Sequence, residues 1–490
     1  MKVKSLKINV ILNMIRTIMQ LIFPLITFPY ASRVLGTESL GKVNFTTSVI
    51  SYFVLIASLG INSYAIREGA SLRENRDKFE HFANEIFSIN VISTFITYVL
   101  MFITFLLVPK FRGGYLILLL IQSTNIAFTT LGVDWIYNIH EEYLYITIRS
   151  ICVQLISMVA LFVFIHGSDD YIKYAIVTVI SGVGANIFNF FHSKKFCHLK
   201  LTFARNLKKH LPPIFTIFFT NVATTIYVNS DTTMLGFWFG DTVVGLYSVA
   251  SRLYSMIKMV FAAIISSVQP RLSAYAVQEN KEKYMSTIND LFAYVLLLVF
   301  PATTGLFLLS ENIILLVSGS AYVQAEMALK LLSFALVFAC LAGIFAGGIF
   351  LPMKKEKITL KATVFGSVIN IVLNVLFIPE YRQDGAALAT AIAEGGVLVI
   401  CVIYGHKYVK IKEFFLNLLQ GLVGCVGIVI VINIIEGLEL INFFFILLSV
   451  LSSIVCYGMV LLLLKNKYAF KIVEQICGAF RNKVLKSKKN

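Results

Sequence analysis

Runs of about twenty apolar residues, separated by short polar connectors, recur along the whole chain of 490 residues. Roughly twenty residues of helix cross a bilayer core about 30 Å thick. A helix also satisfies its backbone polar groups within the segment, as lipid requires. Only 14% of the residues are charged, whereas soluble proteins carry about a quarter. We therefore predict an all-α integral membrane protein without a separate soluble domain.

We expect about fourteen membrane-spanning helices, because fourteen stretches have a suitable length and composition. An even number places both ends of the chain on the same side of the membrane. The first stretch follows three lysines and is too long for a cleaved signal peptide, so we expect it to stay as an anchor. The stretches lie near residues 8–32, 43–66, 82–108, 115–139, 146–166, 174–193, 212–237, 246–268, 291–317, 331–352, 362–378, 386–406, 415–435 and 441–464.

The distribution of positive charge gives this topology an orientation. The side that carries both termini has 31 lysines and arginines, and the other side has 7. Positive residues gather on the cytoplasmic side, so we expect both termini to be cytoplasmic. The net charge of +16 is then mainly a topology signal, helped by anionic membrane lipid. No basic patch is interleaved with aromatic residues as in nucleic-acid-binding modules, so we expect no nucleic-acid partner.

Cysteine and histidine usage does not indicate a cofactor. The seven cysteines form no CxxC pair and mostly lie within apolar runs, so they are interpreted as small buried hydrophobic residues. His192, Cys197 and His198 lie near one another in a basic connector that supplies no fourth ligand. We therefore expect no metal and no cofactor.

Two short motifs indicate an internal repeat. Gly36-Thr-Glu-Ser-Leu-Gly41 follows the first span, and Gly240-Asp-Thr-Val-Val-Gly245 follows the seventh, at an offset of 204 residues. Six spans separate them, so both copies have the same orientation in the membrane. We expect two six-helix lobes around a central cavity, with two further helices at the C-terminal end. The boundaries are 1–193 (first lobe), 194–211 (basic linker), 212–406 (second lobe), 407–464 (spans 13 and 14) and 465–490 (basic tail).

Four cations lie inside apolar runs, where charge is costly and usually faces a cavity or a partner. They are Arg16, Arg149, Arg252 and Lys258. In the first span, Asn13, Arg16 and Gln20 follow helical spacing, so one face of this helix is polar. Arg16 lies about 12 Å from the helix start, near the limit at which its side chain could reach the membrane surface. A cavity-facing position and an interfacial position both remain open.

Polar stripes also follow the other helices that open each lobe. For any one serine or threonine, helix packing is the better interpretation. Together they predict a hydrated cavity lined by hydroxyls and cations. Arginine would offer this cavity a planar fork for anionic oxygens and lysine a point charge, although Arg252 and Lys258 could instead form an internal ion pair with Asp231. The predicted lining residues are Asn13, Gln20, Thr47, Ser51, Thr220, Thr224, Asp231 and Ser255.

Four stretches resemble elements of Wzx-type polysaccharide flippases. Ala31–Ala70 is similar to the first hairpin of that family, and Gly245–Leu253 to the matching element of the second lobe. Asn370–Asn374 and Gly385–Thr390 are similar to the eleventh and twelfth helices. The resemblance spans nearly the whole chain and is specific to the family, not to one substrate. It places the chain in the multidrug/oligosaccharidyl-lipid/polysaccharide exporter superfamily.

The resemblance implies a transporter and not an enzyme. It implies that rocking lobes flip undecaprenyl-pyrophosphate-linked oligosaccharide units across the bacterial inner membrane, for surface polysaccharides such as O-antigen, capsule or lipopolysaccharide. Arg16 and Arg252 occupy positions where related flippases have cavity arginines, and Lys258 is a third candidate for binding the pyrophosphate. The implied partners are the lipid-linked oligosaccharide, membrane lipid, and, as candidates, a polysaccharide polymerase and a chain-length regulator. The coupling ion, H⁺ or Na⁺, stays open.

Three other functions remain as alternatives. A multidrug exporter of the same fold usually handles cationic drugs, which Arg16 disfavours. A peptidoglycan lipid-precursor flippase would need the same chemistry with a different glycan. A membrane glycan polymerase or ligase would place its reactive residues on a sizeable outer loop, whereas the outer connectors here are short, the largest being about 318–330.

Overall fold

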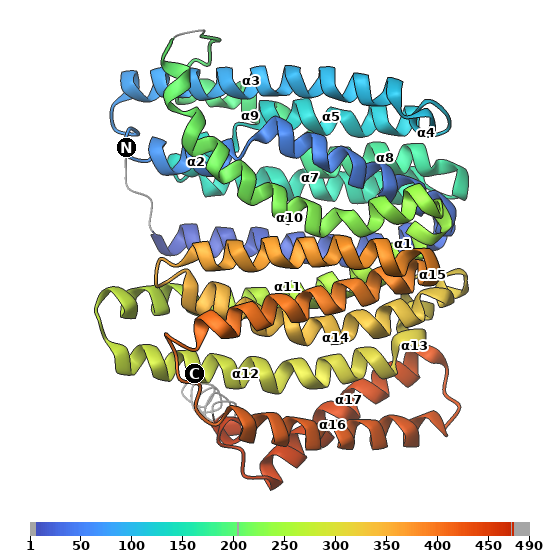
Figure 1. Ribbon diagram of the computed structural model, residues 1–490. Helices are drawn as coiled ribbons and strands as arrows, with labels where there is room; N and C mark the ends of the chain where they lie inside the picture. Colours follow the sequence, from blue (N-terminus) through green and yellow to red (C-terminus); the bar gives the residue numbers. More distant parts are fainter. Residues whose placement is uncertain (1–5, 203–204, 472, 475–490) are drawn as a thin grey trace, which may run out of the picture. The chain divides into compact units, whose positions relative to one another are not determined.

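The protein was analysed as a computed structural model that describes residues 6–202, 205–471 and 473–474 (Figure 1). Between residues 6 and 21, side chains are described only at Leu12, Ile15 and Met19. The described residues form helices joined by turns and contain no strand, which confirms the all-α membrane fold. The chain divides into two compact units, Met1–Ser248 and Val249–Asn490.

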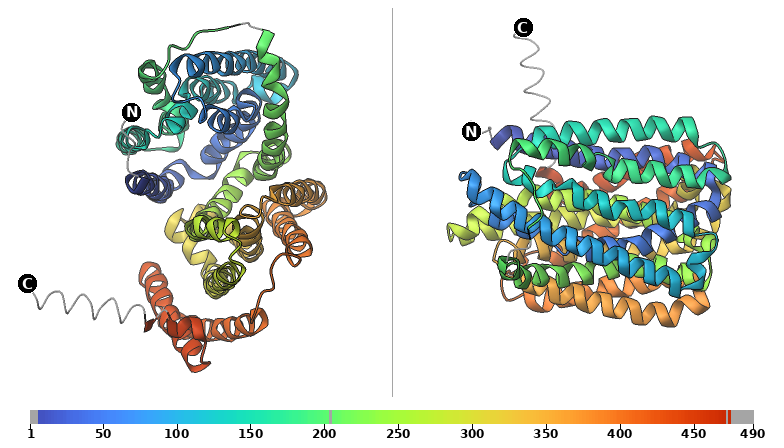
Figure 2. Two further views of the ribbon diagram at one scale, coloured as in Figure 1. Left: turned by 90° about the vertical axis from the view of Figure 1, so that its left-hand side faces the viewer. Right: turned by 90° about the horizontal axis from the view of Figure 1, so that it is seen from above.

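The residues described in unit 1 form ten helices and the start of an eleventh. Short 3-10 or π turns lie beside them at Ser168–Asp170, Ile180–Gly184, Ser193–Lys195 and Arg205–Lys209. The end-on view in Figure 2 shows the long helices of this unit gathered side by side. The helices are α1 (Leu6–Ser58), α2 (Ile61–Gly69), α3 (Arg76–Leu107), α4 (Pro109–Arg112), α5 (Leu116–Gly132), α6 (Asp134–Ile139), α7 (Tyr143–Phe164), α8 (Tyr171–Val179), α9 (Asn186–His192), α10 (Leu211–Trp238) and α11 (Asp241–Val277).

The described residues of unit 2 form the rest of α11 and six more helices, with short 3-10 or π segments at Ser320–Ala325 and Ile344–Phe350. Unit 1 thus includes α10 and the start of α11, and the domain boundaries expected from the sequence stay a prediction. The further helices are α12 (Lys281–Leu308), α13 (Ser310–Val317), α14 (Glu326–Gly343), α15 (Glu356–Gly405), α16 (Phe414–Glu436) and α17 (Asn442–Leu463).

Helix starts follow from local sequence. Asn75 caps α3 by accepting a hydrogen bond from the Lys78 backbone N–H at 3.0 Å. Asn280 caps α12 in the same way, with the Lys283 N–H at 3.1 Å. Prolines stand in the first turns of α4 and α10, where their missing N–H costs nothing. These caps and prolines determine the residues at which the helices begin.

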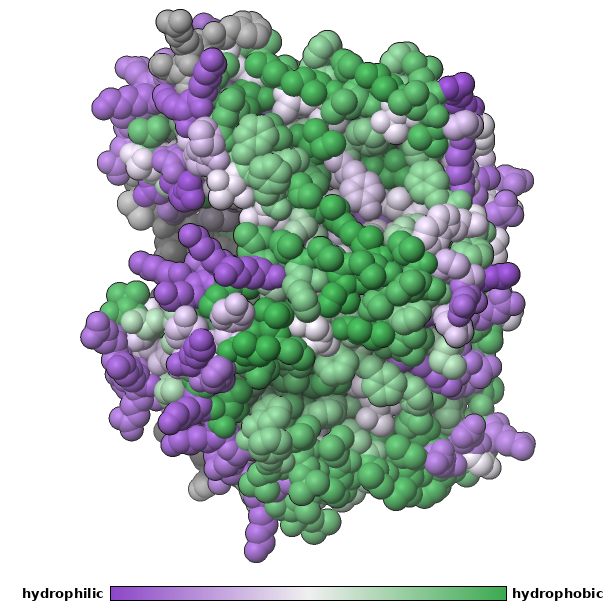
Figure 3. Space-filling model, viewed as in Figure 1, coloured by the Kyte–Doolittle hydropathy of each residue, from purple (hydrophilic) through white to green (hydrophobic). Residues whose placement is uncertain are grey.

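Within the described part of the chain, twelve helical stretches are long and apolar enough to cross a membrane. Large hydrophobic side chains face outward on many of them, for example Phe415 at 80% and Leu463 at 81% exposed. On the surface visible in Figure 3, hydrophobic residues cover the middle of the helices in each unit, and hydrophilic residues gather near the helix ends. This distribution is the one that a lipid-facing surface requires. The chain is therefore a multi-pass integral membrane protein.

Two of the twelve stretches, Ile22–Gly69 and Glu356–Gly405, are 48 and 50 residues long. A continuous helix of fifty residues would measure about 75 Å, more than twice the bilayer core. Each contains a residue with non-helical dihedrals, Gly36 (φ 73°) in α1 and Arg382 (φ 49°) in α15. Each residue lies between two spans expected from the sequence. The count of fourteen depends on treating both stretches as hairpins, and it stays a prediction.

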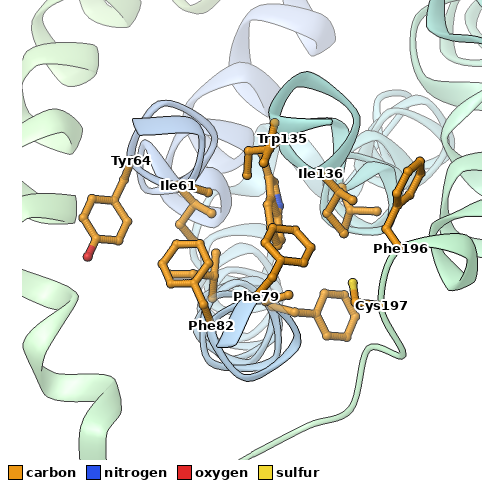
Figure 4. Close-up of a cluster of buried hydrophobic side chains, with 14 of the residues drawn as sticks. Ile61, Tyr64, Phe79, Phe82, Trp135, Ile136, Phe196 and Cys197 are labelled. Atoms are coloured by element: carbon orange, nitrogen blue, oxygen red, sulfur yellow. The ribbon is translucent and has the colours of Figure 1, made fainter. Parts of the chain in front are cut away.

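Each unit has its own hydrophobic contacts. In unit 1, a buried cluster joins α2, α3, α6 and the 196–197 segment, and Figure 4 shows Ile61, Phe79, Trp135 and Phe196 within it. In unit 2, α16 and α17 pack on α12, where the Tyr457 hydroxyl donates to the Leu297 carbonyl at 2.8 Å. The two C-terminal helices are thereby part of the packed body of unit 2.

Candidate substrate-binding site

The middle of α11 presents a polar, cationic face. Arg252, Ser255 and Lys258 follow one another at intervals of three residues, which places them in one sector of the helix. Arg252 and Ser255 are exposed, and the Lys258 side chain is 40% exposed. Exposed residues of this kind within an otherwise apolar span are unusual in lipid. This face, Arg252/Ser255/Lys258, is the best candidate for binding an anion.

Lys258 is held by a buried carboxylate of α15. Its ammonium lies 2.6 Å from Glu394 Oε1, and the Tyr254 hydroxyl donates to the same oxygen at 3.1 Å. The ammonium also lies 5.4 Å from the centre of the Tyr254 ring, within the range of a cation–π contact. The Glu394 side chain is only 6% exposed. Lys258 therefore bridges a buried negative charge and the exposed face of α11.

Asp231, considered from the sequence as an ion-pair partner of Arg252 and Lys258, is bonded to a tyrosine. It lies in α10 and is buried, and its Oδ2 accepts a hydrogen bond from the Tyr247 hydroxyl. The carboxylate paired with Lys258 is Glu394 and not Asp231. Sequence reasoning missed Glu394 because it considered only the cations inside apolar runs. A search for carboxylates within the same runs would have found Glu394 in 386–406 and Glu85 in 82–108.

The threonines of α10 form a stripe that is partly exposed. Thr216, Thr220 and Thr224 each donate to the backbone carbonyl four residues earlier, at 3.0, 3.2 and 3.3 Å. Such bonds satisfy the hydroxyl donor within the helix and leave the oxygen able to accept. Thr224 is exposed and Thr220 half-buried. This stripe offers hydroxyl oxygens without any charge.

The second half of α1 carries two more of the predicted lining residues, Thr47 and Ser51. Thr47 is exposed, donates to the Val43 carbonyl at 2.8 Å and accepts from the Gln122 amide at 3.0 Å. Ser51 is half-buried and donates to the Ser48 carbonyl at 2.6 Å. Both residues thus have local partners, as helix packing would require.

Three of the sequence candidates cannot be placed. The side chains of Asn13, Arg16 and Gln20 lie outside the described part of the chain, although the backbone there belongs to α1. Arg149, the fourth intramembrane cation, lies 3.5 Å from Asp134 Oδ1, and its side chain is only 8% exposed. Among the described residues, no cluster of histidine, cysteine or acidic side chains could hold a metal ion.

The two glycine motifs of the internal repeat contact each other within unit 1. A Cβ added to Gly41 would lie 1.8 Å from the backbone oxygen of Asp241, and one added to Gly245 would lie 2.0 Å from the backbone oxygen of Thr37. The offset of 204 relates Thr37 to Asp241 and Gly41 to Gly245. Each motif therefore places its glycine against a backbone carbonyl of the other motif. Gly36 and Gly240 also share a positive φ, 73° and 86°. We call Thr37/Gly41/Asp241/Gly245 the glycine contact.

Lys110 of α4 supports the same end of unit 1. Its ammonium donates to the Gly236 carbonyl and lies 5.1 Å from the Phe45 ring centre and 5.7 Å from those of Tyr115 and Phe237. Burial lowers the pKa of Lys110, while the nearby Asp241 carboxylate acts in the opposite direction. The Tyr115 hydroxyl donates to Asp241 Oδ1 at 2.7 Å. Lys110 and Tyr115 therefore stabilise the α10–α11 turn beside the glycine contact.

At the opposite end of α10, a network of titratable groups joins the linker to α2 and α3. The Tyr64 hydroxyl and His210 Nδ1 lie 2.7 Å apart, and His210 Nε2 lies 2.8 Å from Glu85 Oε2. Lys209 lies 3.1 Å from the same oxygen, and His81 lies 3.5 Å from Oε1. The Glu85 side chain is 1% exposed. A cavity of about 500 Å³ beside it is lined by Glu85, His81, Lys209 and residues of α3.

The helical spans and the lipid-facing surface define a multi-pass membrane protein, and the family models that match it define a transporter of the flippase class. The chain belongs to the polysaccharide biosynthesis protein family, whose model matches residues 6–276, and the MatE model matches residues 216–376. It is a Wzx-type flippase of the multidrug/oligosaccharidyl-lipid/polysaccharide exporter superfamily, as the sequence resemblance implied. The chain is accordingly a transporter and not an enzyme, as are its relatives of named function.

Relatives of known sequence include a protein of Escherichia coli (strain K12) named for O-antigen transport. It is 22% identical over 394 residues, which cover 80% of this chain and 94% of that protein. A Haloferax volcanii protein named as a low-salt glycan biosynthesis flippase, Agl15, is 26% identical over 182 residues, covering 37% and 38% of the two chains. The lipid II flippase MurJ of Bacillus subtilis is 29% identical over 143 residues, covering 29% and 26%.

Solved structures show the same fold. Lipid II flippase MurJ in an inward closed conformation superposes with a TM-score of 0.75 at 19% identity, covering 95% of this chain and 99% of that one. An inward-facing multidrug resistance transporter of the MATE family gives a TM-score of 0.62 at 15% identity, covering 80% and 97%. At these identities the similarity concerns the fold alone.

Proposed function

We propose that this protein flips undecaprenyl-pyrophosphate-linked oligosaccharide units from the cytoplasmic to the outer leaflet of the bacterial inner membrane. The observation that carries the proposal is the face Arg252/Ser255/Lys258, which offers a guanidinium, a hydroxyl and an ammonium within a membrane-spanning helix. A pyrophosphate accepts hydrogen bonds from such donors and gains from their charge. The glycan would contact hydroxyl groups such as those of Thr220 and Thr224.

The mechanism we infer is alternating access. The site opens toward the cytoplasm, the cations bind the pyrophosphate, and a rearrangement of the two halves of the protein then exposes it on the outer side. The prenyl chain stays in lipid throughout. Relatives named for O-antigen transport and for glycan flipping support this substrate class. Cytoplasmic termini follow from the charge bias of the connectors, and a polysaccharide polymerase and a chain-length regulator are proposed as partners.

Complementation of a flippase-deficient strain tests the site. We expect Arg16→Ala, Arg252→Ala and Lys258→Ala to reduce surface glycan at least tenfold while lipid-linked intermediate accumulates inside. Arg16→Lys keeps the charge without the planar fork and should lose less than Arg16→Ala. Lys330→Ala is the matched control, because Lys330 also has an ion pair at 2.6 Å, with Glu326, but lies on α14. Membrane levels of every variant are measured by immunoblot.

Normal surface glycan in the α11 variants at equal protein level would remove these cations from the site. The choice of strain separates the alternatives. Rescue of a strain lacking its peptidoglycan-precursor flippase, without rescue of a surface-polysaccharide mutant, would identify the other lipid-linked substrate. Resistance to cationic drugs conferred by expression, without either rescue, would identify a multidrug exporter.

A further inference from the structure

The cavity near the start of α3 holds a buried carboxylate oxygen that lacks a hydrogen bond. The Glu85 side chain is 1% exposed, and its Oε2 has the contacts with His210 and Lys209 described above. Its Oε1 accepts no hydrogen bond from any described residue, and its ion-pair neighbour His81 Nδ1 lies 3.5 Å away. A buried acceptor in this state costs free energy that a donor would recover. Because Glu85 lines the cavity of about 500 Å³, a ligand held there can supply that donor.

The polar lining of this cavity carries charges of both signs. Asp77, Lys78 and His81 are exposed and lie with Glu85 on one face of α3, because steps of three and four residues return to the same side of a helix. Lys209 of the linker completes the lining, with a side chain that is 56% exposed. We call these five residues the α3 pocket. A purely anionic ligand would meet two carboxylates there, and a purely cationic ligand would meet two ammonium groups, so a ligand with both charges matches the lining best.

The α3 pocket lies where the polar connector before α3 meets the apolar span. Its apolar lining consists of Leu72 and Phe82, and Phe82 belongs to the buried cluster shown in Figure 4. Three turns beyond His81 on the same face, α3 exposes large hydrophobic side chains, beginning with Ile92 at 36% and Phe95 at 69%. Lipid headgroups lie at the depth of such a boundary, and basic pockets between membrane helices bind their phosphates. The hydrophobic strip of α3 would contact the acyl chains of the same lipid.

The linker between α9 and α10 is fixed on α3 beside the pocket. The backbone N–H of Lys200 donates to Asn84 Oδ1 at 2.7 Å, and that of Thr202 donates to Ser88 Oγ at 2.8 Å. The linker residue Lys209 then reaches Glu85 from the other end of the same connector. All these residues belong to unit 1. A ligand that contacts both α3 and Lys209 would therefore also hold the linker in place.

We propose that the α3 pocket binds a phosphoethanolamine group, whose primary ammonium donates to Glu85 Oε1 while its phosphate oxygens accept from Lys78 and Lys209. The source is phosphatidylethanolamine of the surrounding membrane, because the hydrophobic strip of α3 accommodates its acyl chains; free O-phosphoethanolamine carries the same charged groups. A primary ammonium has three N–H donors, whereas the trimethylammonium of phosphatidylcholine has none, and phosphatidylglycerol has no positive charge. The site uses no residue of the α11 face, so the inference is independent of the proposed function.

Native mass spectrometry of the purified full-length protein in detergent counts bound lipids and tests this inference. Dioleoyl phosphatidylethanolamine, phosphatidylcholine and phosphatidylglycerol are titrated separately. We expect one phosphatidylethanolamine to bind with a dissociation constant about tenfold below those of the other two, as one hydrogen bond between charged groups would give. Lys78→Ala and Glu85→Gln should each remove this preference. Lys208→Ala is the matched control, because Lys208 is exposed and adjacent to Lys209 but does not line the pocket, and it should bind as the wild type does.

Competition with free O-phosphoethanolamine separates the two sources of the ligand. Displacement of bound phosphatidylethanolamine would confirm that the headgroup is recognised. Binding of the free compound, without any preference among the three lipids, would keep the site and make the soluble ester its ligand. If Glu85→Gln folds poorly, the exposed Lys78→Ala decides the test. Equal binding of the three lipids without binding of the free compound, a preference for phosphatidylglycerol, or the same affinities in Lys78→Ala as in Lys208→Ala would overturn the inference.

Discussion

At the scale of residues, two buried glutamates organise the polar chemistry of the described chain. Glu394 lies beside one exposed lysine, whereas Glu85 has nitrogen atoms from His210, Lys209 and His81 within 3.5 Å. A buried carboxylate is stable only with such partners. The three groups around Glu85 make it an anchor, whereas Glu394 is bonded to Lys258 and Tyr254 through one oxygen.

The anchor around Glu85 leads to a prediction about stability. His210→Ala removes a bond to Glu85 and one to Tyr64, both from a side chain that is 5% exposed. We expect a loss of about 1–3 kcal/mol of unfolding free energy, because the buried Glu85 carboxylate and the Tyr64 hydroxyl each lose a partner while Glu85 keeps only Lys209 and His81. The readout is the melting temperature of the purified protein in detergent. His81→Ala is the control, since His81 is 64% exposed and should change little; equal melting temperatures for the two variants would contradict the anchor.

At the scale of elements, the Gly36–Gly41 turn of α1 and the Gly240–Gly245 turn between α10 and α11 meet through the glycine contact. The atoms that a new methyl group would strike belong to the backbone, at 1.8 and 2.0 Å, so no side chain can rotate away. The sequence located both turns through their shared G-x-x-x-x-G spacing. It could not predict that they touch, because the contact joins segments about 200 residues apart and depends on how the helices pack.

Gly41→Ala and Gly245→Ala should therefore separate these turns. We expect each to lower stability by about 1–3 kcal/mol or more through overpacking, and to reduce surface glycan in the complementation assay. Gly305→Ala and Gly458→Ala are matched controls in helices where an added Cβ meets nothing within 4 Å. The controls should gain up to about 1 kcal/mol from helix propensity. If Gly41→Ala melted at the same temperature as the controls, the two turns would accommodate the added methyl group without loss of stability, and the prediction would be wrong.

At the scale of the whole molecule, the fold follows from length and polarity, whereas the partners of single charges do not. Apolar runs of suitable length predicted the membrane class and most spans, because lipid leaves few alternatives for the backbone. The Lys258–Glu394 pair could not be predicted in the same way. It joins residues 136 positions apart, and Asp231 was the acidic residue nearer in sequence. Helical periodicity predicts on which face of its own helix a side chain lies, but not which neighbouring helix this face contacts.

The topology is open to a direct test at this scale. With 31 basic residues on one predicted side and 7 on the other, green fluorescent protein fused to the C-terminus should fluoresce in the cytoplasm. Alkaline phosphatase inserted in the 437–441 connector should be active. This connector is separated from the C-terminus by one span, so it lies on the outer side, where the enzyme folds. If alkaline phosphatase fused to the C-terminus were active and green fluorescent protein fused there were dark, the C-terminus would lie outside. The predicted orientation, and the direction proposed for transport, would then be wrong.

The glycine contact also has a symmetry of its own. Each half offers the same two surfaces, a bare glycine and a carbonyl oxygen, and each surface meets its opposite from the other half. This exchange is the hallmark of an isologous, twofold interface between identical subunits. A protein with one copy of the motif could form the contact twice by pairing with itself. The two motifs of the present chain thus meet, in four backbone positions, with the pairing pattern of a twofold interface.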